Sequence, residues 1–150
     1  MQNEIIVNSL AETENLAKKL AKVVECGDCI LLYGEIGAGK TTFTKFLLEN
    51  LEVKSIVSSP TFTLLNEYSG KYPIYHFDMY RISSSDELYE LGFEDYLDSK
   101  NSKYVKTGLT LIEWPDNVKN ILPKERIEIT IEKLGDNKRK FIIKNLKKEI

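Results

Sequence analysis

The sequence contains few of the residues that several functional classes need in number. It has two cysteines, one histidine and a formal net charge of only −2 over 150 residues. A chain that mainly wraps nucleic acid normally has a strong basic excess, so this class is not favoured. No apolar run approaches the roughly 18 residues that span a bilayer, and we expect neither a signal peptide nor a membrane helix. We therefore expect a cytoplasmic protein that makes no membrane contact.

The two cysteines, Cys26 and Cys29, have the spacing C-x-x-C. Two thiols with no histidine nearby are too few for a four-ligand zinc site. A redox pair stays open as an alternative, but Cys29 leads directly into the apolar residues 30–32, which favours small buried side chains. We assign these cysteines no function.

Hydrophobic patterning in the first third of the chain predicts strands that alternate with helices. Residues 4–7 are β-prone, and Ser9 with Glu12 fits a capping box that begins an amphipathic helix of about four turns. Residues 29–33 are apolar without alternation, as in a strand buried within a parallel sheet. A second helical pattern covers residues 41–51.

The rest of the chain predicts several more strands and some short helices. Strands are expected at 55–57 and 109–113, hairpins over 62–78 and 127–143, and short helices over 84–98 and after Pro115. No repeat or domain-sized linker occurs, so we expect one domain over residues 1–150. The predicted fold is an α/β, P-loop NTPase-like, three-layer domain whose partly parallel sheet is extended by antiparallel strands.

Residues 34–41, with the sequence GEIGAGKT, fit the phosphate-binding pattern G-x-x-x-x-G-K-[ST]. The pattern also occurs by chance in glycine-rich turns, but here a buried strand precedes it and a helix follows. Gly37 and Gly39 allow the backbone N–H groups to approach an anion at the positive end of the helix. Lys40 would then bridge the β- and γ-phosphates, and the Thr41 hydroxyl would ligate Mg²⁺. The segment predicts binding of a nucleoside triphosphate with magnesium.

Two acidic residues compete for the role of the carboxylate that organises the metal and the attacking water. Asp78 follows the apolar residues 74–77, and Glu113 follows residues 109–112. Both sit where a strand is predicted to end, so the pattern does not rank them. Either could instead cap a turn or a helix.

The scarcity of arginine bears on the reaction. The motifs N-K-x-D and D-x-x-G of GTP-binding switch proteins are both absent, which favours ATP. A small-molecule kinase, the nearest rival, would use guanidinium groups to clamp phosphates. The arginines are Arg81, Arg126 and Arg139, and only Arg81 is expected near the phosphates. Hydrolysis is therefore favoured over phosphoryl transfer, slow in the isolated chain and faster with a partner.

Five motifs occur in an order that resembles a known family. The sequence resembles the bacterial TsaE (YjeE-type) ATPases of tRNA threonylcarbamoyladenosine biosynthesis from about residue 9 to residue 131. The family pattern often has leucine where this chain has Ile36 and Met79. The motifs are GEIGAGKTT at 34–42, SPTF at 59–62, HFDMYR at 76–81, ELG with DY at 90–96, and IEWP at 112–115.

The resemblance implies roles for particular residues. Glu113 corresponds to the magnesium-linked carboxylate, Asp78 to an acid that the ATPase activity needs, and Thr61 to a segment that responds to the γ-phosphate. Lys40 and Thr41 keep their phosphate and metal roles. The implied nucleotide-binding set is Thr13, Gly37, Ala38, Gly39, Lys40, Thr41 and Thr42, with Lys40, Thr61, Asp78 and Glu113 as the implied catalytic set.

Three further residues keep two interpretations. Thr13 could contact the base or ribose, or it could cap the first helix. Trp114 adjoins the predicted metal carboxylate but could equally be a core aromatic. His76 is expected to pack against or orient Asp78, and not to act as a catalyst.

The resemblance also implies partners. These would be TsaD-type and TsaB-type subunits of the complex that transfers threonylcarbamoyl to tRNA, so contact with tRNA would be indirect. ATP hydrolysis would then reset or release this complex. The alternative is a binding switch, in which ATP drives assembly and hydrolysis is incidental.

Overall fold

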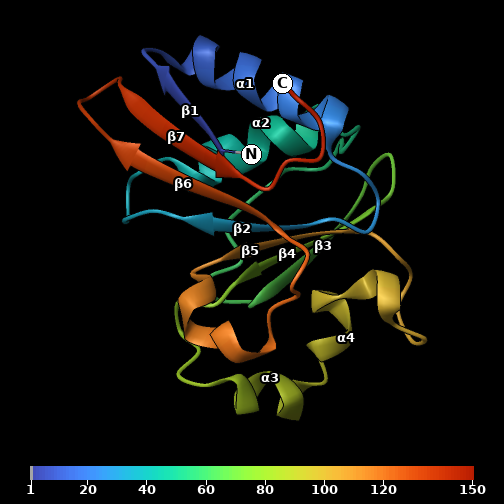
Figure 1. Ribbon diagram of the computed structural model, residues 1–150. Helices are drawn as coiled ribbons and strands as arrows, with labels where there is room; N and C mark the ends of the chain where they lie inside the picture. The colour runs from blue at the N-terminus through green and yellow to red at the C-terminus, as the bar shows by residue number, and fades with distance from the viewer. Residues whose placement is uncertain (1) are drawn as a thin grey trace.

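The computed structural model describes residues 2–150, which contain one sheet of seven strands (Figure 1). These are β1 (Gln2–Val7), β2 (Cys29–Tyr33), β3 (Leu65–Ser69), β4 (Pro73–Asp78), β5 (Leu109–Glu113), β6 (Ile127–Lys133) and β7 (Arg139–Lys144). Their order across the sheet is β1-β7-β6-β2-β5-β4-β3. The neighbours β6, β2, β5 and β4 run parallel, whereas β3 at one edge and β7 and β1 at the other pair antiparallel.

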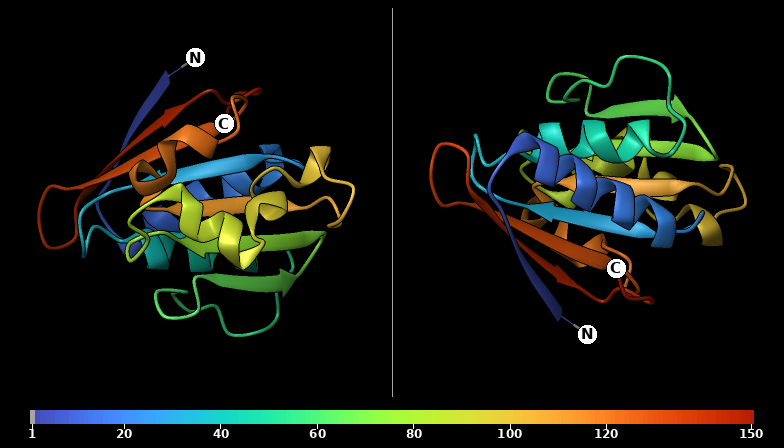
Figure 2. Two further views of the ribbon diagram at one scale, coloured as in Figure 1. Left: turned by 90° about the horizontal axis from the view of Figure 1, so that it is seen from below. Right: turned by 90° about the horizontal axis from the view of Figure 1, so that it is seen from above.

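Helices cover both faces of this sheet, which gives three layers (Figures 1 and 2). Helices α1 (Leu10–Val23) and α2 (Lys40–Glu49) lie on one face. Helices α3 (Ser85–Leu91) and α4 (Glu94–Leu97) lie on the other, with the 3-10 segments η1 (Ser99–Asn101) and η2 (Pro115–Ile121). The predicted α/β three-layer fold, with a partly parallel sheet extended by antiparallel strands, is confirmed. No helix within residues 2–150 is long and apolar enough to cross a membrane.

The core consists of two apolar layers, one on each side of the sheet. Along β2, Ile30 and Leu32 join the layer beneath α1 and α2, while Leu31 joins the layer beneath α3 and η2. All three side chains are completely buried. Burial on both faces explains why this strand is uniformly apolar in the sequence. Fully burying one such side chain contributes about 1.5–3 kcal/mol, so β2 is firmly anchored.

Most predicted elements occur where the patterning placed them. The capping box at α1 is present: the Glu12 N–H donates to Ser9 Oγ at 3.1 Å. The reciprocal bond is donated to Glu12 Oε1 by the N–H of Asn8, at 3.3 Å, and not by that of Ser9. The two predicted hairpins are β3 with β4 and β6 with β7.

The prediction of a strand at residues 55–57 is wrong. Residues 50–64, between α2 and β3, contain no strand, and Ile56 is 90% exposed. The run does not add to the open edge of the sheet at β3, whose ladder partner is β4, and a β-prone run without ladder hydrogen bonds is not a strand. It belongs instead to an irregular segment that reaches the predicted site.

The parallel strands bring the predicted site residues to one edge of the sheet. Strand β2 ends just before the glycine-rich loop, β4 ends at Asp78 and β5 ends at Glu113. Glu113 is the register partner of Leu32 on one side and of Asp78 on the other. Since the carboxyl ends of parallel strands meet at the same edge, this is where an α/β sheet binds its ligands.

Candidate functional site

The loop of residues 34–39 connects β2 to the first turn of α2. Gly37 and Gly39 have φ values of 84° and 108°, in the left-handed region that side chains disfavour. A Cβ added at Gly34 would lie 2.9 Å from the carbonyl oxygen of Ile131, so β6 leaves no room for a side chain there. Gly39 is the N-cap of α2, and the unpaired N–H groups of a helix start attract anions. This geometry suits a phosphate chain.

Lys40, the first residue of α2, is buried against the loop. Its Nζ donates to the carbonyl oxygen of Gly34 and lies 3.8 Å from the centroid of the Trp114 ring. Burial lowers the pKa of Lys40 from its ordinary value, and the nearby carboxylates of Glu113, Asp78 and Glu35 oppose that shift. The ammonium group is thus desolvated beside anions, as a group that binds phosphate oxygens should be.

Asp78 and Glu113 lie side by side at the ends of β4 and β5. Both are buried, at 5% and 3% exposure, and Met79 N–H donates to the backbone oxygen of Glu113 at 3.0 Å. Both carboxylates also favour the charged form of Lys40, against the lowering of its pKa by burial, so the ammonium group and the two carboxylates form one cluster of interacting charges. The two acids that the sequence could not rank therefore reach the same edge of the sheet.

The irregular segment between α2 and β3 contacts Asp78. Thr61 Oγ1 donates to Asp78 Oδ2 at 2.8 Å, and Ser59 Oγ lies 3.5 Å from the same oxygen. The other carboxylate oxygen, Oδ1, accepts from the N–H of Tyr80 at 2.9 Å. Asp78 is thereby oriented by one bond from its own turn and by hydroxyls of a separate segment. Next to Thr61, the exposed ring of Phe62 lies 4.4 Å from the guanidinium of Arg81.

His76 pairs with a different acid from the one expected. Its Nε2 lies 2.7 Å from Glu113 Oε2, and both side chains are buried. The expectation that His76 orients Asp78 is wrong, because its hydrogen bond goes to Glu113 on the neighbouring strand. No sequence signal distinguishes the two acids, since a histidine in β4 reaches β5 only through the sheet register.

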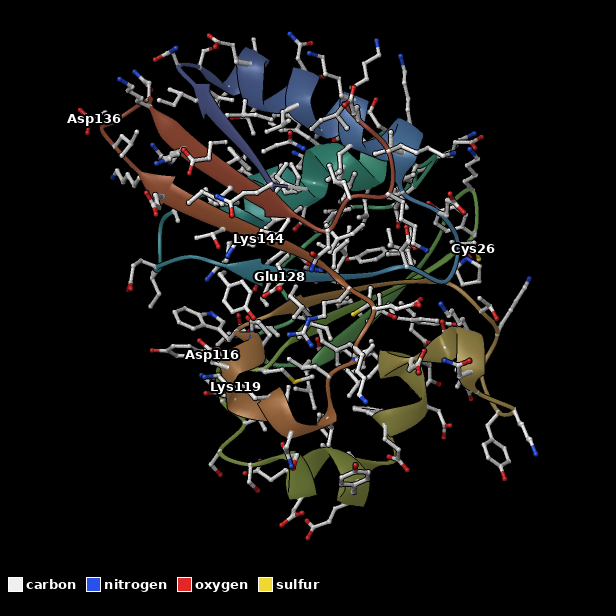
Figure 3. The ribbon with its side chains drawn as sticks, viewed as in Figure 1. Cys26, Asp116, Lys119, Glu128, Asp136 and Lys144 are labelled. Atoms are coloured by element: carbon white, nitrogen blue, oxygen red, sulfur yellow. The ribbon has the colours of Figure 1, made fainter. Side chains whose placement is uncertain are left out.

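A small cavity of about 80 Å³ lies beside the loop, between α1, the start of α2 and the β6–β7 hairpin. The hairpin contributes Asp136, which Figure 3 shows at its tip. Thr13 of α1 lines the cavity, and its Oγ1 donates to the carbonyl oxygen of Ser9 at 3.3 Å. Ser9 itself is the N-cap of α1. The cavity brings together four of the predicted nucleotide-binding residues: Thr13, Ala38, Gly39 and Thr42.

Arg139 contacts the phosphate loop, which the sequence did not indicate. Its Nε donates to the carbonyl oxygen of Ala38 at 2.9 Å, and its Nη1 donates to that of Gly135 at 2.8 Å. The expectation that Arg81 alone would lie near the phosphates is therefore wrong. Ala38 and Arg139 are 101 positions apart, so only the fold brings them together.

The donors at this edge fit a magnesium ion. Mg²⁺ prefers hard oxygen ligands and usually combines one or two carboxylates with phosphate oxygens and water. Thr41 lies exposed in the first turn of α2, and the two buried carboxylates end the strands nearby. Residues 2–150 contain no cluster of three or more His, Cys, Asp or Glu side chains arranged for a metal. A metal here would thus depend on the nucleotide for further ligands.

The cysteines lie at the opposite end of β2 from the phosphate loop. Cys29 is buried, and burial raises the pKa of its thiol to about 12. Cys26 is exposed, and its Sγ donates to the carbonyl oxygen of Thr107 at 3.3 Å. A thiol with a raised pKa is a poor nucleophile, so the structure adds no argument for redox chemistry at Cys29.

Known proteins resemble this chain over most of its length. A family model described as threonylcarbamoyl adenosine biosynthesis protein TsaE matches residues 7–141. The tRNA threonylcarbamoyladenosine biosynthesis protein TsaE of Bacillus subtilis is 42% identical over 131 residues, which cover 87% of this chain and 77% of the relative. The protein of the same name from Rickettsia prowazekii is 42% identical over 135 residues, with 89% and 88% covered.

A solved structure resembles the fold as well. The crystal structure of Bacillus subtilis YdiB superposes with a TM-score of 0.77 at 35% sequence identity. The match covers 95% of this chain and 84% of YdiB.

Proposed function

The chain belongs to the TsaE family of tRNA threonylcarbamoyladenosine biosynthesis, and from this premise we propose that it binds and hydrolyses ATP with Mg²⁺ in that pathway. The observation that carries the proposal is that the buried acids Asp78 and Glu113 end neighbouring parallel strands at the sheet edge where Lys40 packs against the phosphate loop. One cation and two carboxylates next to an anion-binding helix start match the parts that phosphoryl chemistry requires.

Each part has a distinct role in the proposal. The loop N–H groups and Lys40 bind the β- and γ-phosphates, and Thr41 and Glu113 hold the metal. Bound Mg²⁺ supplies neutralisation of the charge that develops on the phosphate oxygens. Asp78, with Thr61 on its Oδ2, orients the attacking water. No covalent intermediate is needed, because positioning and electrostatics account for this class of reaction.

The cavity between α1 and the hairpin is our candidate site for the base and ribose. It adjoins Gly39 and Thr42 at the start of α2, so a nucleotide with its phosphates on the loop would extend into it. Its lining offers the Thr13 hydroxyl and the Asp136 carboxylate as polar partners, while Phe141 supplies an apolar surface.

The contacts of the arginines support slow hydrolysis in the isolated chain. Arg139 donates to backbone carbonyls, Arg81 lies over Phe62, and Arg126 donates to the carbonyl oxygen of Pro123. None of these contacts aims a guanidinium at the cluster of Lys40 and the two acids. We propose that TsaD-type and TsaB-type subunits of the transferase complex accelerate turnover in the cytoplasm, with tRNA contacted only through that complex.

Phosphate release, measured with and without the reconstituted partner complex, tests this function. We expect slow release alone, acceleration by the partners, and loss of activity in Asp78→Ala with ATP binding retained. Phosphate that appears on a small-molecule acceptor would replace the proposal by a kinase. Multiple-turnover tRNA modification by an inactive Asp78→Ala variant would replace it by a binding switch.

The roles of the two acids are distinguished by the magnesium dependence of nucleotide binding in their variants. We expect Glu113→Ala to weaken Mg²⁺-dependent nucleotide binding more than Asp78→Ala does, measured by titration with and without the metal. The reverse order would transfer the metal role to Asp78.

A further inference from the structure

His76 is a buried ionisable residue to which the proposed reaction gives no role. It is completely buried in β4, and its Nε2 lies 2.7 Å from Oε2 of Glu113, which is itself 3% exposed. Asp78, two residues further along the strand, makes its bonds to Thr61 and Tyr80 instead. The side chain of His76 is therefore directed at a single partner, the acid to which we give the metal.

The surroundings of the ring select one tautomer. A carboxylate is an acceptor, so the proton of this bond lies on Nε2. The other ring nitrogen, Nδ1, is buried and has no hydrogen-bond partner within residues 2–150. A proton there would be a buried donor without an acceptor, which is costly. The arrangement thus fits a ring that donates through Nε2 and is unprotonated at Nδ1.

This bond determines how Glu113 is presented to the site. The terminal torsion of a glutamate is broad, and here a second carboxylate, Asp78, is its register partner on the neighbouring strand. Without a restraint, repulsion would favour rotation of Glu113 away from Asp78. His76 restrains the carboxylate by its Oε2, which leaves Oε1 free of protein hydrogen bonds among the described residues.

We propose that His76 is a positioning residue that binds Oε2 of Glu113 and so presents Oε1 as the single oxygen available to Mg²⁺ and its waters. The metal half of this inference rests on the proposed function; the pairing of His76 with Glu113 does not. Mg²⁺ demands near-octahedral geometry, so a fixed single oxygen suits it better than a mobile carboxylate. Mutation of a residue that hydrogen-bonds a metal ligand typically reduces metal affinity by about 10–100-fold.

Two substitutions test the metal half. His76→Leu removes the donor, whereas the amide nitrogen of His76→Gln lies at nearly the reach of Nε2 and keeps one. Nucleotide affinity is measured with Mg²⁺ and with a chelator. We expect His76→Leu to lose about 10–100-fold of the affinity that Mg²⁺ adds, with affinity in chelator unchanged, and His76→Gln to restore most of it.

Tyr75→Phe is the matched control. Tyr75 precedes His76 in β4, and its side chain lies on the opposite face of the sheet. The substitution removes the hydroxyl that donates to the carbonyl oxygen of Lys106 at 2.6 Å. The increase in nucleotide affinity that Mg²⁺ causes should be the same in Tyr75→Phe as in the wild type. An unchanged gain in a folded His76→Leu protein, or an equal loss in Tyr75→Phe, would overturn the proposal.

The pairing itself is tested on the wild type without metal or nucleotide. Because the chain has one histidine, the ring nitrogens give a single unambiguous set of ¹⁵N signals. We expect the signature of the Nε2–H tautomer, lost in Glu113→Leu. A ring protonated at Nδ1 alone, with no proton on Nε2, would overturn the inference even if no His76 variant folds. A wild type whose nucleotide affinity shows no magnesium dependence would instead contradict the proposed function and the metal half, while these spectra still decide the pairing.

Discussion

The Thr61 hydroxyl donates to Oδ2 of Asp78 at 2.8 Å, across 17 positions of sequence. Thr61 belongs to the irregular segment before β3, and Asp78 ends β4. This hydrogen bond joins a surface segment to the buried acid at the candidate site. Any ligand that draws the Thr61 hydroxyl away would release one oxygen of Asp78, so the two residues are expected to act as a pair.

Thr61→Val removes this donor while keeping the side-chain shape. We expect phosphate release to fall about tenfold, the effect of one hydrogen bond of about 1.4 kcal/mol, with nucleotide affinity changed less than twofold. The measurement is steady-state phosphate release beside a binding titration. Thr63→Val is the control, since Thr63 is exposed and donates to Asn66 and not to Asp78. Equal slowing in both variants would remove the special role of Thr61.

The one tryptophan is expected to report nucleotide binding. Lys40 Nζ lies 3.8 Å from the Trp114 ring centroid, and the Tyr80 ring lies 5.0 Å from it. A triphosphate that draws Lys40 toward its oxygens would weaken this cation–π contact and change the emission of Trp114. Fluorescence during an ATP-analogue titration checks this. Lys40→Met should lose the response, and unchanged emission at saturation would show that Lys40 does not move.

Lys40→Met is expected to stabilise the fold while abolishing nucleotide binding. Burial lowers the pKa of Lys40, so the charged form is less favourable in the folded chain than in the unfolded one. Wild-type stability should then increase as pH rises from the lowered pKa toward 10.5, the ordinary value, because the folded state releases its proton first.

Denaturant unfolding at several pH values tests this expectation. The advantage of Lys40→Met over the wild type should be largest below the lowered pKa of Lys40 and should narrow as pH rises. Lys45→Met, at an exposed position of the same helix, should show no such trend. An advantage that widens with pH would mean that the carboxylates outweigh burial.

Arg139 is expected to support the phosphate loop from the hairpin. It donates to the carbonyl oxygens of Ala38 and Gly135, so it joins two walls of the candidate base cavity. We expect Arg139→Ala to weaken nucleotide binding by about 10–150-fold, the equivalent of the 1.5–3 kcal/mol typical of hydrogen bonds from charged groups. Arg126→Ala, remote from the loop, is the control in calorimetric titrations. Unchanged affinity in Arg139→Ala would show that the loop needs no such support.

Local patterns predicted the parts of this protein that depend on neighbours in sequence. The glycines of residues 34–39, the capping box at Ser9 and the two hairpins all rest on interactions between residues a few positions apart. The prediction of a strand at 55–57 was wrong because a strand also needs a partner strand, and local pattern does not show whether a run pairs with one. The resemblance of ordered motifs added the family, which the comparisons confirm.

The sequence by itself determined the phosphate loop, the layers of the fold and the two strand-ending acids, because backbone conformation and the period of apolar residues are local properties. Only the tertiary structure decided that His76 pairs with Glu113, that Thr61 pairs with Asp78, and that Arg139 braces the loop. The physical reason is that these contacts depend on sheet register and chain crossing. Such relationships join residues 17 to 101 positions apart, and no local propensity encodes them.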